Sequence, residues 1–213
     1  MRWQLELVSG PEIEPVTLAE MRRHLRMFED VTDEDADITA LITGAREWVE
    51  DYTGRILIDQ TWRLSIDQTG DLWLDPATTS VIVSDDPDSP GFYLRRSPIL
   101  AIVSVNTVDA DGAETLVDTA DYELRAADSK FPFLVPTSTA TWRDANLRIE
   151  FRAGFADLTG SPQDDAGVVP ERFKQAMKLW VEAHYDRDEK MMQQLLDAAE
   201  NIAKRLKGQV GFA

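Results

Sequence analysis

Two histidines are the chain's main candidates for proton transfer, and neither has sequence neighbours typical of a catalytic base. His24 lies among arginines between Arg22 and Arg26, and His184 follows a stripe of aromatic residues. A catalytic imidazole needs a nucleophile and an orienting group within hydrogen-bond reach. The pattern instead favours a surface position for His24 and packing between helices for His184.

Acidic clusters are the second candidate, because carboxylates catalyse glycoside hydrolysis and bind calcium. Asp109, Asp111 and Gly112, with Asp118, partly follow the spacing of a calcium loop. However, Thr107 stands at the first ligand position, and Asp118 stands where a bidentate glutamate is expected. An Asp-Gly hairpin turn accounts for the same residues. A hydrolase that pairs distant carboxylates through folding stays open as a weaker alternative.

Other kinds of site are excluded by missing residue types and motifs. The chain has no cysteine, which excludes disulfides, thiol catalysis and zinc sites with sulfur ligands. It holds no glycine-rich phosphate loop, dinucleotide-binding turn or His-Glu-x-x-His pair. No apolar run approaches the roughly 20 residues of a membrane span, and the N-terminal residues lack the apolar stretch of a signal peptide. Nothing in these residues requires an enzyme or a metal site.

The charge balance limits the partners of the chain. It has 39 acidic and 22 basic residues, for a formal net charge of −17. Such a surface repels phosphate groups and anionic lipids, so specific nucleic-acid binding and membrane attachment are not expected. A solvated acidic surface explains this charge. The alternatives are a surface past which DNA slides, an acidic DNA mimic, or an interaction protein with a basic partner.

The N-terminal part of the chain has the pattern of a helical hairpin. Thr17 and Glu20 have the capping-box spacing, and a second helix is predicted to begin near Thr32. Apolar residues then recur at helical spacing as far as Gly54, a natural end for a helix. The sequence therefore predicts a helical hairpin over residues 17–54.

The pattern then changes to a period of two, and later back to a helical period. Alternating runs and turn residues predict six to eight strands in residues 59–155, including short runs at 71–74 and 80–84. A helix is predicted from Pro170, continuing or bending near residues 186–190. The predicted class is α+β: an N-terminal helical hairpin and C-terminal long helices form a helical bundle, with an inserted antiparallel β unit. The predicted domains are a helical core at 1–58 and 168–207, a β domain at 59–155, a loop at 156–167 and a tail at 208–213.

The ordered set of motifs resembles the head–tail connector, or adaptor, family of tailed bacteriophages and gene transfer agents. The motifs that carry the resemblance span residues 11–190. They are Glu14–Glu20, His24–Arg26, Ala45–Arg55, Gln60–Trp62, Arg96–Ile99, Val105–Gly112, Tyr122, Ile149–Phe155, Val169–Pro170, Lys174–Met177 and Tyr185–Arg187.

This resemblance implies a structural protein of the virion neck that is made in the host cytoplasm. Such proteins form a homo-oligomeric ring of about a dozen subunits beneath the portal protein. The ring extends the DNA conduit, through which DNA passes without specific binding, and docks a neck or tail stopper or terminator protein. The family has no catalytic residues and no cofactor.

The resemblance also directs attention to two sets of residues. The apolar stripes of the helical part are predicted to form one core and the lateral contacts of the ring: Leu25, Leu41, Ala45, Trp48, Val49, Tyr52, Phe173, Met177 and Trp180. The C-terminal segment is predicted to contact the portal, although packing on its own subunit is an open alternative. Its candidate residues are Lys190, Met192, Leu195, Leu196, Ala199, Ile202, Lys204, Arg205, Leu206, Lys207, Val210 and Phe212.

Overall fold

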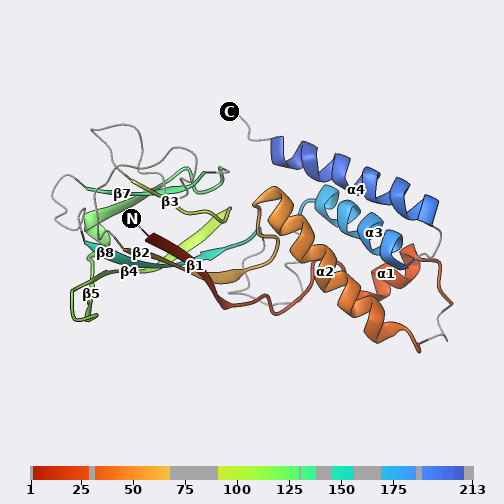
Figure 1. Ribbon diagram of the computed structural model, residues 1–213, viewed down its shortest axis with the longest axis horizontal. Helices are drawn as coiled ribbons and strands as arrows, with labels where there is room; N and C mark the ends of the chain where they lie inside the picture. Colours follow the sequence, from red (N-terminus) through yellow and green to blue (C-terminus); the bar gives the residue numbers. More distant parts are fainter. Residues whose placement is uncertain are drawn as a thin grey trace. The chain divides into compact units, whose positions relative to one another are not determined.

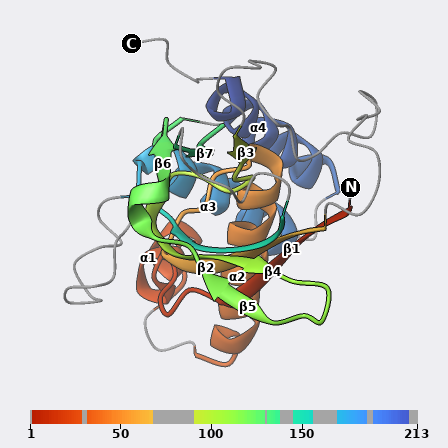
Figure 2. The same ribbon diagram turned by 90° about the vertical axis from the view of Figure 1, so that its left-hand side faces the viewer.

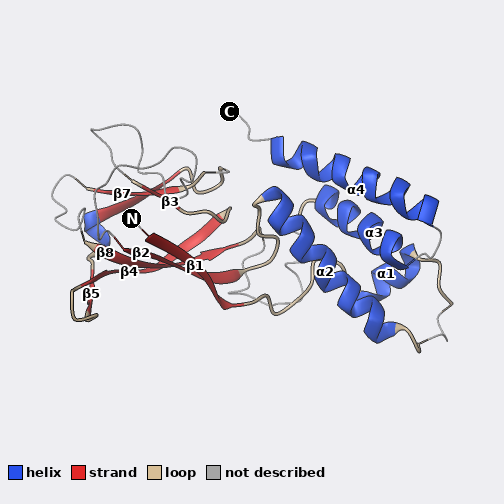
Figure 3. Cartoon of the chain, viewed as in Figure 1, coloured by secondary structure: helices blue, strands red, loops and turns tan. Residues whose placement is uncertain are grey.

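The computed structural model confirms the α+β class in the residues that it describes, which are 2–28, 32–67, 91–129, 131–137, 145–155, 169–185 and 189–208. Those residues hold four α-helices and two antiparallel sheets. The chain divides into two compact units (Figures 1 and 3). The β unit comprises Met1–Gly10 and Asp59–Gly154, and the helical unit comprises Pro11–Ile58 and Phe155–Ala213.

The placement of the first ten residues differs from the prediction that 1–58 belongs to the helical part. Strand β1 (Arg2–Ser9) lies in the β unit, where it pairs antiparallel with β2 (Gln60–Asp67). Trp3, Leu5 and Leu7 alternate with polar residues, so a strand period was present in the sequence. However, the alternation of residues does not show that the pairing partner of this strand lies nearly sixty residues away.

The described residues of the helical unit form four helices with a common core. They are α1 (Leu18–His24), α2 (Asp35–Thr53), α3 (Glu171–Tyr185) and α4 (Glu189–Gly208). Thr17 caps α1 as predicted, because its hydroxyl accepts a hydrogen bond from the Glu20 amide. Gly54 ends α2 in the left-handed conformation, with φ of 72°. The structure thus confirms the two helices, α1 and α2, of the predicted hairpin.

In the β unit, the residues that the structure describes form a five-stranded sheet and a three-stranded sheet. The larger sheet has the order β1-β2-β8-β4-β5 and the smaller one the order β3-β7-β6. The remaining strands are β3 (Phe92–Tyr93), β4 (Ile99–Val108), β5 (Glu114–Leu116), β6 (Tyr122–Arg125), β7 (Phe133–Pro136) and β8 (Asn146–Ala153), with a 3₁₀ turn, η1 (Thr119–Asp121), before β6.

The smaller sheet lies over one face of the larger one (Figures 1 and 2). Every second residue of β2 and β8 is buried, so one face of the larger sheet supplies a second core. Trp62, Leu64 and Ile66 lie on this buried face, as their alternation predicts. The short runs predicted at 71–74 and 80–84 and the loop predicted at 156–167 lie outside the described residues.

The Asp-Gly segment forms the predicted hairpin turn between β4 and β5. The Asp109 carboxylate accepts hydrogen bonds from the amides of Asp111, at 3.0 Å, and Ala113, at 2.8 Å. Gly112 has φ of 85°, and the turn residues are exposed. The Asp109 carboxylate is therefore occupied by the turn itself, which agrees with a structural rather than a calcium-binding role.

Replacing Gly112 with valine should destabilise the hairpin by about 1–3 kcal/mol, because a β-branched residue is strained at this φ. No heavy atom outside its immediate neighbours lies within 4 Å of a Cβ added at Gly112, so the cost comes from the backbone and not from a clash. Urea unfolding monitors the change, with Gly112→Asn as the control that tolerates positive φ. The helical unit should stay folded in the valine variant, because the strain is confined to the hairpin. Loss of the helical circular dichroism signal would contradict this expectation.

A pH-dependent contact joins α1 to α3. Lys178 Nζ donates to Glu20 Oε1 at 2.6 Å. Burial alone raises the pKa of Glu20, but the hydrogen bond and charge of Lys178, with smaller contributions from Lys174 and Thr17, outweigh burial and lower it. A carboxyl whose pKa is lowered by folding stabilises the protein above its unfolded pKa, and this stabilisation disappears as the pH falls through the folded pKa.

We therefore expect Lys178→Met to lower the free energy of unfolding at pH 7 by about 0.5–1 kcal/mol, since the pair is partly exposed. The difference in the free energy of unfolding between the variant and the unmodified protein should shrink as the pH is lowered below the pKa of a free glutamate side chain. Urea titrations at several pH values measure it, with the exposed Lys204→Met as the matched control. A difference that stays constant down to pH 3 would contradict the assignment.

Candidate interaction sites

The two histidines make structural contacts. His24 Nε2 lies 2.9 Å from Glu182 Oε2, and the His184 ring stacks on Trp180 with ring centroids 3.6 Å apart. Among the described residues, no three His, Asp or Glu side chains come close enough to hold a metal ion. None of the helices in the described ranges is both long and apolar enough to cross a membrane.

The predicted ring-core residues lie in the core of the helical unit or against it. Ala45, Val49, Phe173 and Met177 are buried. Leu25, Leu41, Trp48 and Trp180 are partly buried and pack on that core, while Tyr52 is half-buried and packs on the Trp48 ring. The structure therefore shows how these side chains stabilise one subunit. Only the exposed parts of these side chains are available for a contact with a neighbouring subunit.

A cleft opens at one end of the helical unit, where α1 and α3 end and α2 begins. Its volume is about 1030 Å³, and its lining combines a small apolar area with charged groups. The lining residues are His24, Leu25, Arg26, Glu34, Asp37, Leu41, Glu182, His184 and Tyr185. No sequence pattern indicates this cleft, because its walls come from three segments that only folding brings together.

The electrostatic character of the cleft is acidic. Glu34, Asp37 and Glu182 contribute three carboxylates, against the single guanidinium of Arg26. Glu34 accepts a hydrogen bond from the Tyr185 hydroxyl, and Glu182 contacts His24. Asp37 is exposed and has no hydrogen bond or ion pair with another described residue. The cleft thus offers carboxylates beside a partly uncovered apolar surface.

Helix α4 uses its apolar face within its own subunit. Ala199 and Ala203 are buried, and Ile202 and Leu206 pack on the core. Met192, Leu195 and Leu196 are half-buried. Of the predicted portal-contact residues, those that remain exposed are Lys190, Lys204, Arg205 and Lys207, while Val210 and Phe212 lie outside the described residues.

The C-terminal end of α4 is attached to the end of α2 through Tyr52. The Tyr52 hydroxyl donates to Glu200 at 3.1 Å, and Lys207 Nζ lies 5.3 Å from the centre of the Tyr52 ring. Burial and the Glu200 carboxylate raise the pKa of Tyr52. Glu200 is thereby engaged by Tyr52, and the chain from 201 to 208 carries basic but no acidic side chains.

The outer face of the five-stranded sheet carries arginines that are matched by carboxylates. Arg63 pairs with Glu150, and the hydrogen bond to Glu150 is the main cause of the raised pKa of Arg63. Arg148 lies 2.9 Å from Glu114, and Arg152 pairs with Asp59. These basic groups are compensated, so this face is not a basic stripe of the kind that binds nucleic acid.

Beneath the surface, the helical unit holds a charged network that the sequence analysis missed. Arg46 is buried between α2 and the segment before α1, where it contacts Glu50 at 2.9 Å and Glu14 at 3.0 Å. Glu50 is also buried and accepts a hydrogen bond from the Leu57 amide. The available signal was the i, i+4 spacing of Arg46 and Glu50 beside the apolar stripe.

Comparison with known proteins confirms the resemblance that the motifs predicted. Residues 15–108, somewhat less than half of the chain, match the phage gp6-like head-tail connector protein family. The match covers α1 and α2 together with β2, β3 and β4. No curated protein sequence matches the chain significantly.

Solved structures of gene transfer agent (GTA) particles share the fold over most of the chain. A chain from the neck of an empty GTA particle, computed with C6 symmetry, has 22% identity and a TM-score of 0.63, covering 90% of this chain and 94% of that one. A chain from the virion of the native particle has 21% identity and a TM-score of 0.65, with the same coverage. A chain from the native neck, computed with C12 symmetry, has 20% identity and a TM-score of 0.61, covering 92% and 94%.

Proposed function

Because residues 15–108 match the head–tail connector family, we propose that this chain is a structural connector subunit in the neck of a tailed-phage or GTA particle. The observation that carries the proposal is that this match coincides with a fold shared over about nine-tenths of the chain with GTA neck proteins. The contacts of both histidines, which are structural, support a role without catalysis.

The proposed assembly is a ring of about 12 copies. Its support is that the similar neck chains were solved in particles treated with C6 and C12 symmetry. Closed rings need a heterologous contact, in which two different surfaces of the subunit meet. The helical unit offers such surfaces at its two ends.

In this proposal the ring lines a passage for DNA and does not bind it. The net charge of −17 disfavours adsorption of phosphate. The pairing of Arg63, Arg148 and Arg152 with carboxylates supports the same interpretation, because it neutralises a group of basic side chains. DNA can then pass without being held.

We propose that the portal contact lies at the C-terminal end. The packing of the apolar face of α4 on its own subunit supports a contact made by the residues after the helix, which include Val210 and Phe212. The opposite face of the ring would dock a stopper or terminator component.

The stoichiometry of the chain in purified particles tests this function. We expect about 12 copies per particle in the neck, by quantitative mass spectrometry and by cryo-electron microscopy. Particles made without the chain should retain the portal but lack tails. One or two copies per particle, or a position at the tail tip, would overturn the proposal. A monomer or dimer bound to a basic cellular protein, and absent from particles, would instead support the acidic DNA mimic.

A further inference from the structure

We propose that neighbouring copies of the chain contact each other end to end, with the basic last turns of α4 in one copy seated at the acidic cleft of the next. This inference rests on the proposed ring and names its lateral contact. The basic last turns are residues 201–208, and the cleft is the one bordered by Glu34, Asp37 and Glu182. The occupant is thus a second copy of this chain.

The first argument is the chemistry of the cleft. Three carboxylates border it against the single cation of Arg26, and Asp37 makes no ion pair with another described residue. Leu25 and Leu41 also line it and are only partly covered by the core of their own subunit. An occupant that carries cations beside aliphatic stems would satisfy both features, and lysine and arginine side chains have that composition.

The second argument is the scarcity of complementary surfaces on an acidic chain. Copies with a net charge of −17 repel one another unless regions of opposite sign meet. Lys204, Arg205 and Lys207 are all exposed, and residues 201–208 contain no acidic side chain. The last turns of α4 are therefore a concentrated basic region, whose charge is opposite in sign to that of the cleft.

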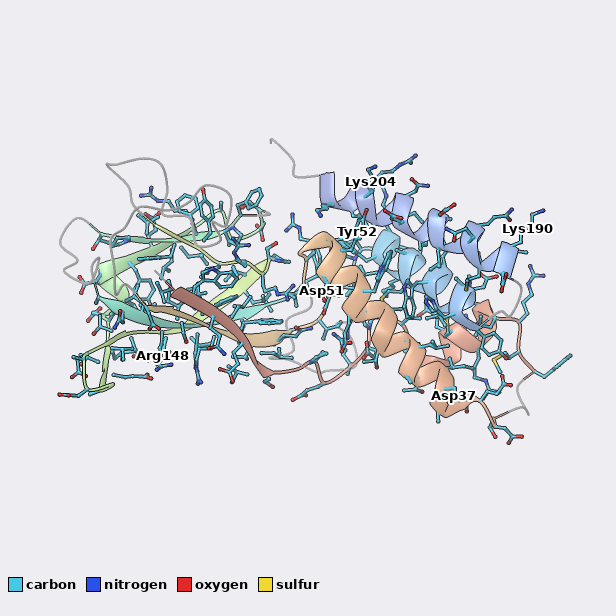
Figure 4. The ribbon with its side chains drawn as sticks, in the orientation of Figure 1. Asp37, Asp51, Tyr52, Arg148, Lys190 and Lys204 are labelled. Carbon is cyan, nitrogen blue, oxygen red and sulfur yellow. The ribbon has the colours of Figure 1, made fainter. Side chains whose placement is uncertain are left out.

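The third argument is that the two regions lie at opposite ends of the helical unit. Figure 4 shows Asp37 at one end and Lys204, close to Tyr52, at the other. Lys207 contacts Tyr52, which follows Asp37 on α2 by 15 residues, or about 22 Å along the helix axis. A subunit cannot fill its own cleft with its own basic turns. The contact must be heterologous, and a heterologous contact generates a ring when the rotation between subunits closes.

Engineered cysteines give a direct test, because the chain has no cysteine of its own. A disulfide needs Cα atoms less than about 7 Å apart, which excludes an Asp37→Cys to Lys204→Cys bond within one subunit. Mixing the two single variants under oxidising conditions should give crosslinked dimers that contain one of each. The double variant should give a ladder of oligomers. Lys204→Cys mixed with Asp111→Cys, on the exposed β4–β5 turn, is the control and should not crosslink.

The same crosslinking is carried out in purified particles, which separates this inference from the proposed function. If the unmodified chain, analysed in parallel, is absent from particles, the proposed function fails. If the cysteine variants are present at about 12 copies and the double variant gives no ladder, the end-to-end contact is overturned and the ring stands. Dimers formed by Asp37→Cys alone would also overturn it, because they indicate a two-fold contact.

Charge reversal provides a second, independent measurement. Lys204→Glu with Lys207→Glu should weaken self-association at low salt by about tenfold or more, and so should Glu34→Lys with Asp37→Lys. Combining all four should restore association, because the signs of both surfaces are exchanged. Association is followed by sedimentation at 50 and 500 mM salt, and the loss should be smaller at high salt. Failure of the combined variant to recover, with each variant folded by circular dichroism, would contradict the pairing.

Discussion

Replacing Arg46 with methionine is expected to lower the free energy of unfolding by about 3–5 kcal/mol, among the largest effects of any single substitution in this chain. The reason is that the buried Glu50 carboxylate would lose the hydrogen bond and the opposite charge of the Arg46 guanidinium. Glu14 would also lose its contact with α2. Urea unfolding followed by circular dichroism measures the change.

Two further variants make this prediction specific. Glu14→Gln should lower the free energy of unfolding by less, about 1 kcal/mol. Glu14 is partly exposed, and the side-chain amide oxygen of the glutamine can still accept a hydrogen bond. Replacing both Arg46 and Glu50 with apolar residues of similar size should recover much of the loss. If the double replacement is as destabilising as Arg46→Met, then the loss of packing, and not the loss of the Arg46–Glu50 ion pair, is responsible.

Deleting α4 together with the tail, residues 189–213, is expected to destabilise the helical unit by more than about 3 kcal/mol. If α4 served only the predicted portal contact, its deletion would leave a folded and soluble protein. In the structure, Ile202 and Leu206 pack on the core, and Ala199 and Ala203 are buried. Their removal would expose apolar surface of α2 and α3 to water. Thermal unfolding and the solubility of the shortened protein check this.

A shorter deletion separates stability from portal contact. Removing only residues 209–213 leaves α4 whole, so the melting temperature should stay within about 2 °C of the full-length protein. The proposed portal contact predicts that this protein no longer joins capsids that carry a portal but no neck. Normal incorporation of the five-residue truncation would rule out the tail as the portal contact, whatever its stability.

Local chemistry made some elements predictable from the sequence. The Thr17 cap, the left-handed Gly54 and the Asp109 turn each depend on hydrogen bonds and backbone angles within a few residues. The period of the apolar residues then distinguished helix from strand, because a buried face repeats every 3.6 residues in a helix and every two in a strand. These signals sufficed for the α+β class and for the motifs that resemble a connector.

The helical hairpin, the β4–β5 turn, the acidic charge and the apolar stripes were predictable from the amino-acid sequence, since each of these is a property of residue types and their local spacing. Three other features follow from packing in three dimensions: β1 joins the β unit, Arg46 is buried between two carboxylates, and the apolar stripe of α4 is used within its own subunit. Packing alone also forms the cleft, from residues of α1, α2 and α3. The physical reason is that pairing partners, burial and cavities depend on contacts between segments far apart in the chain, which no local period or propensity encodes.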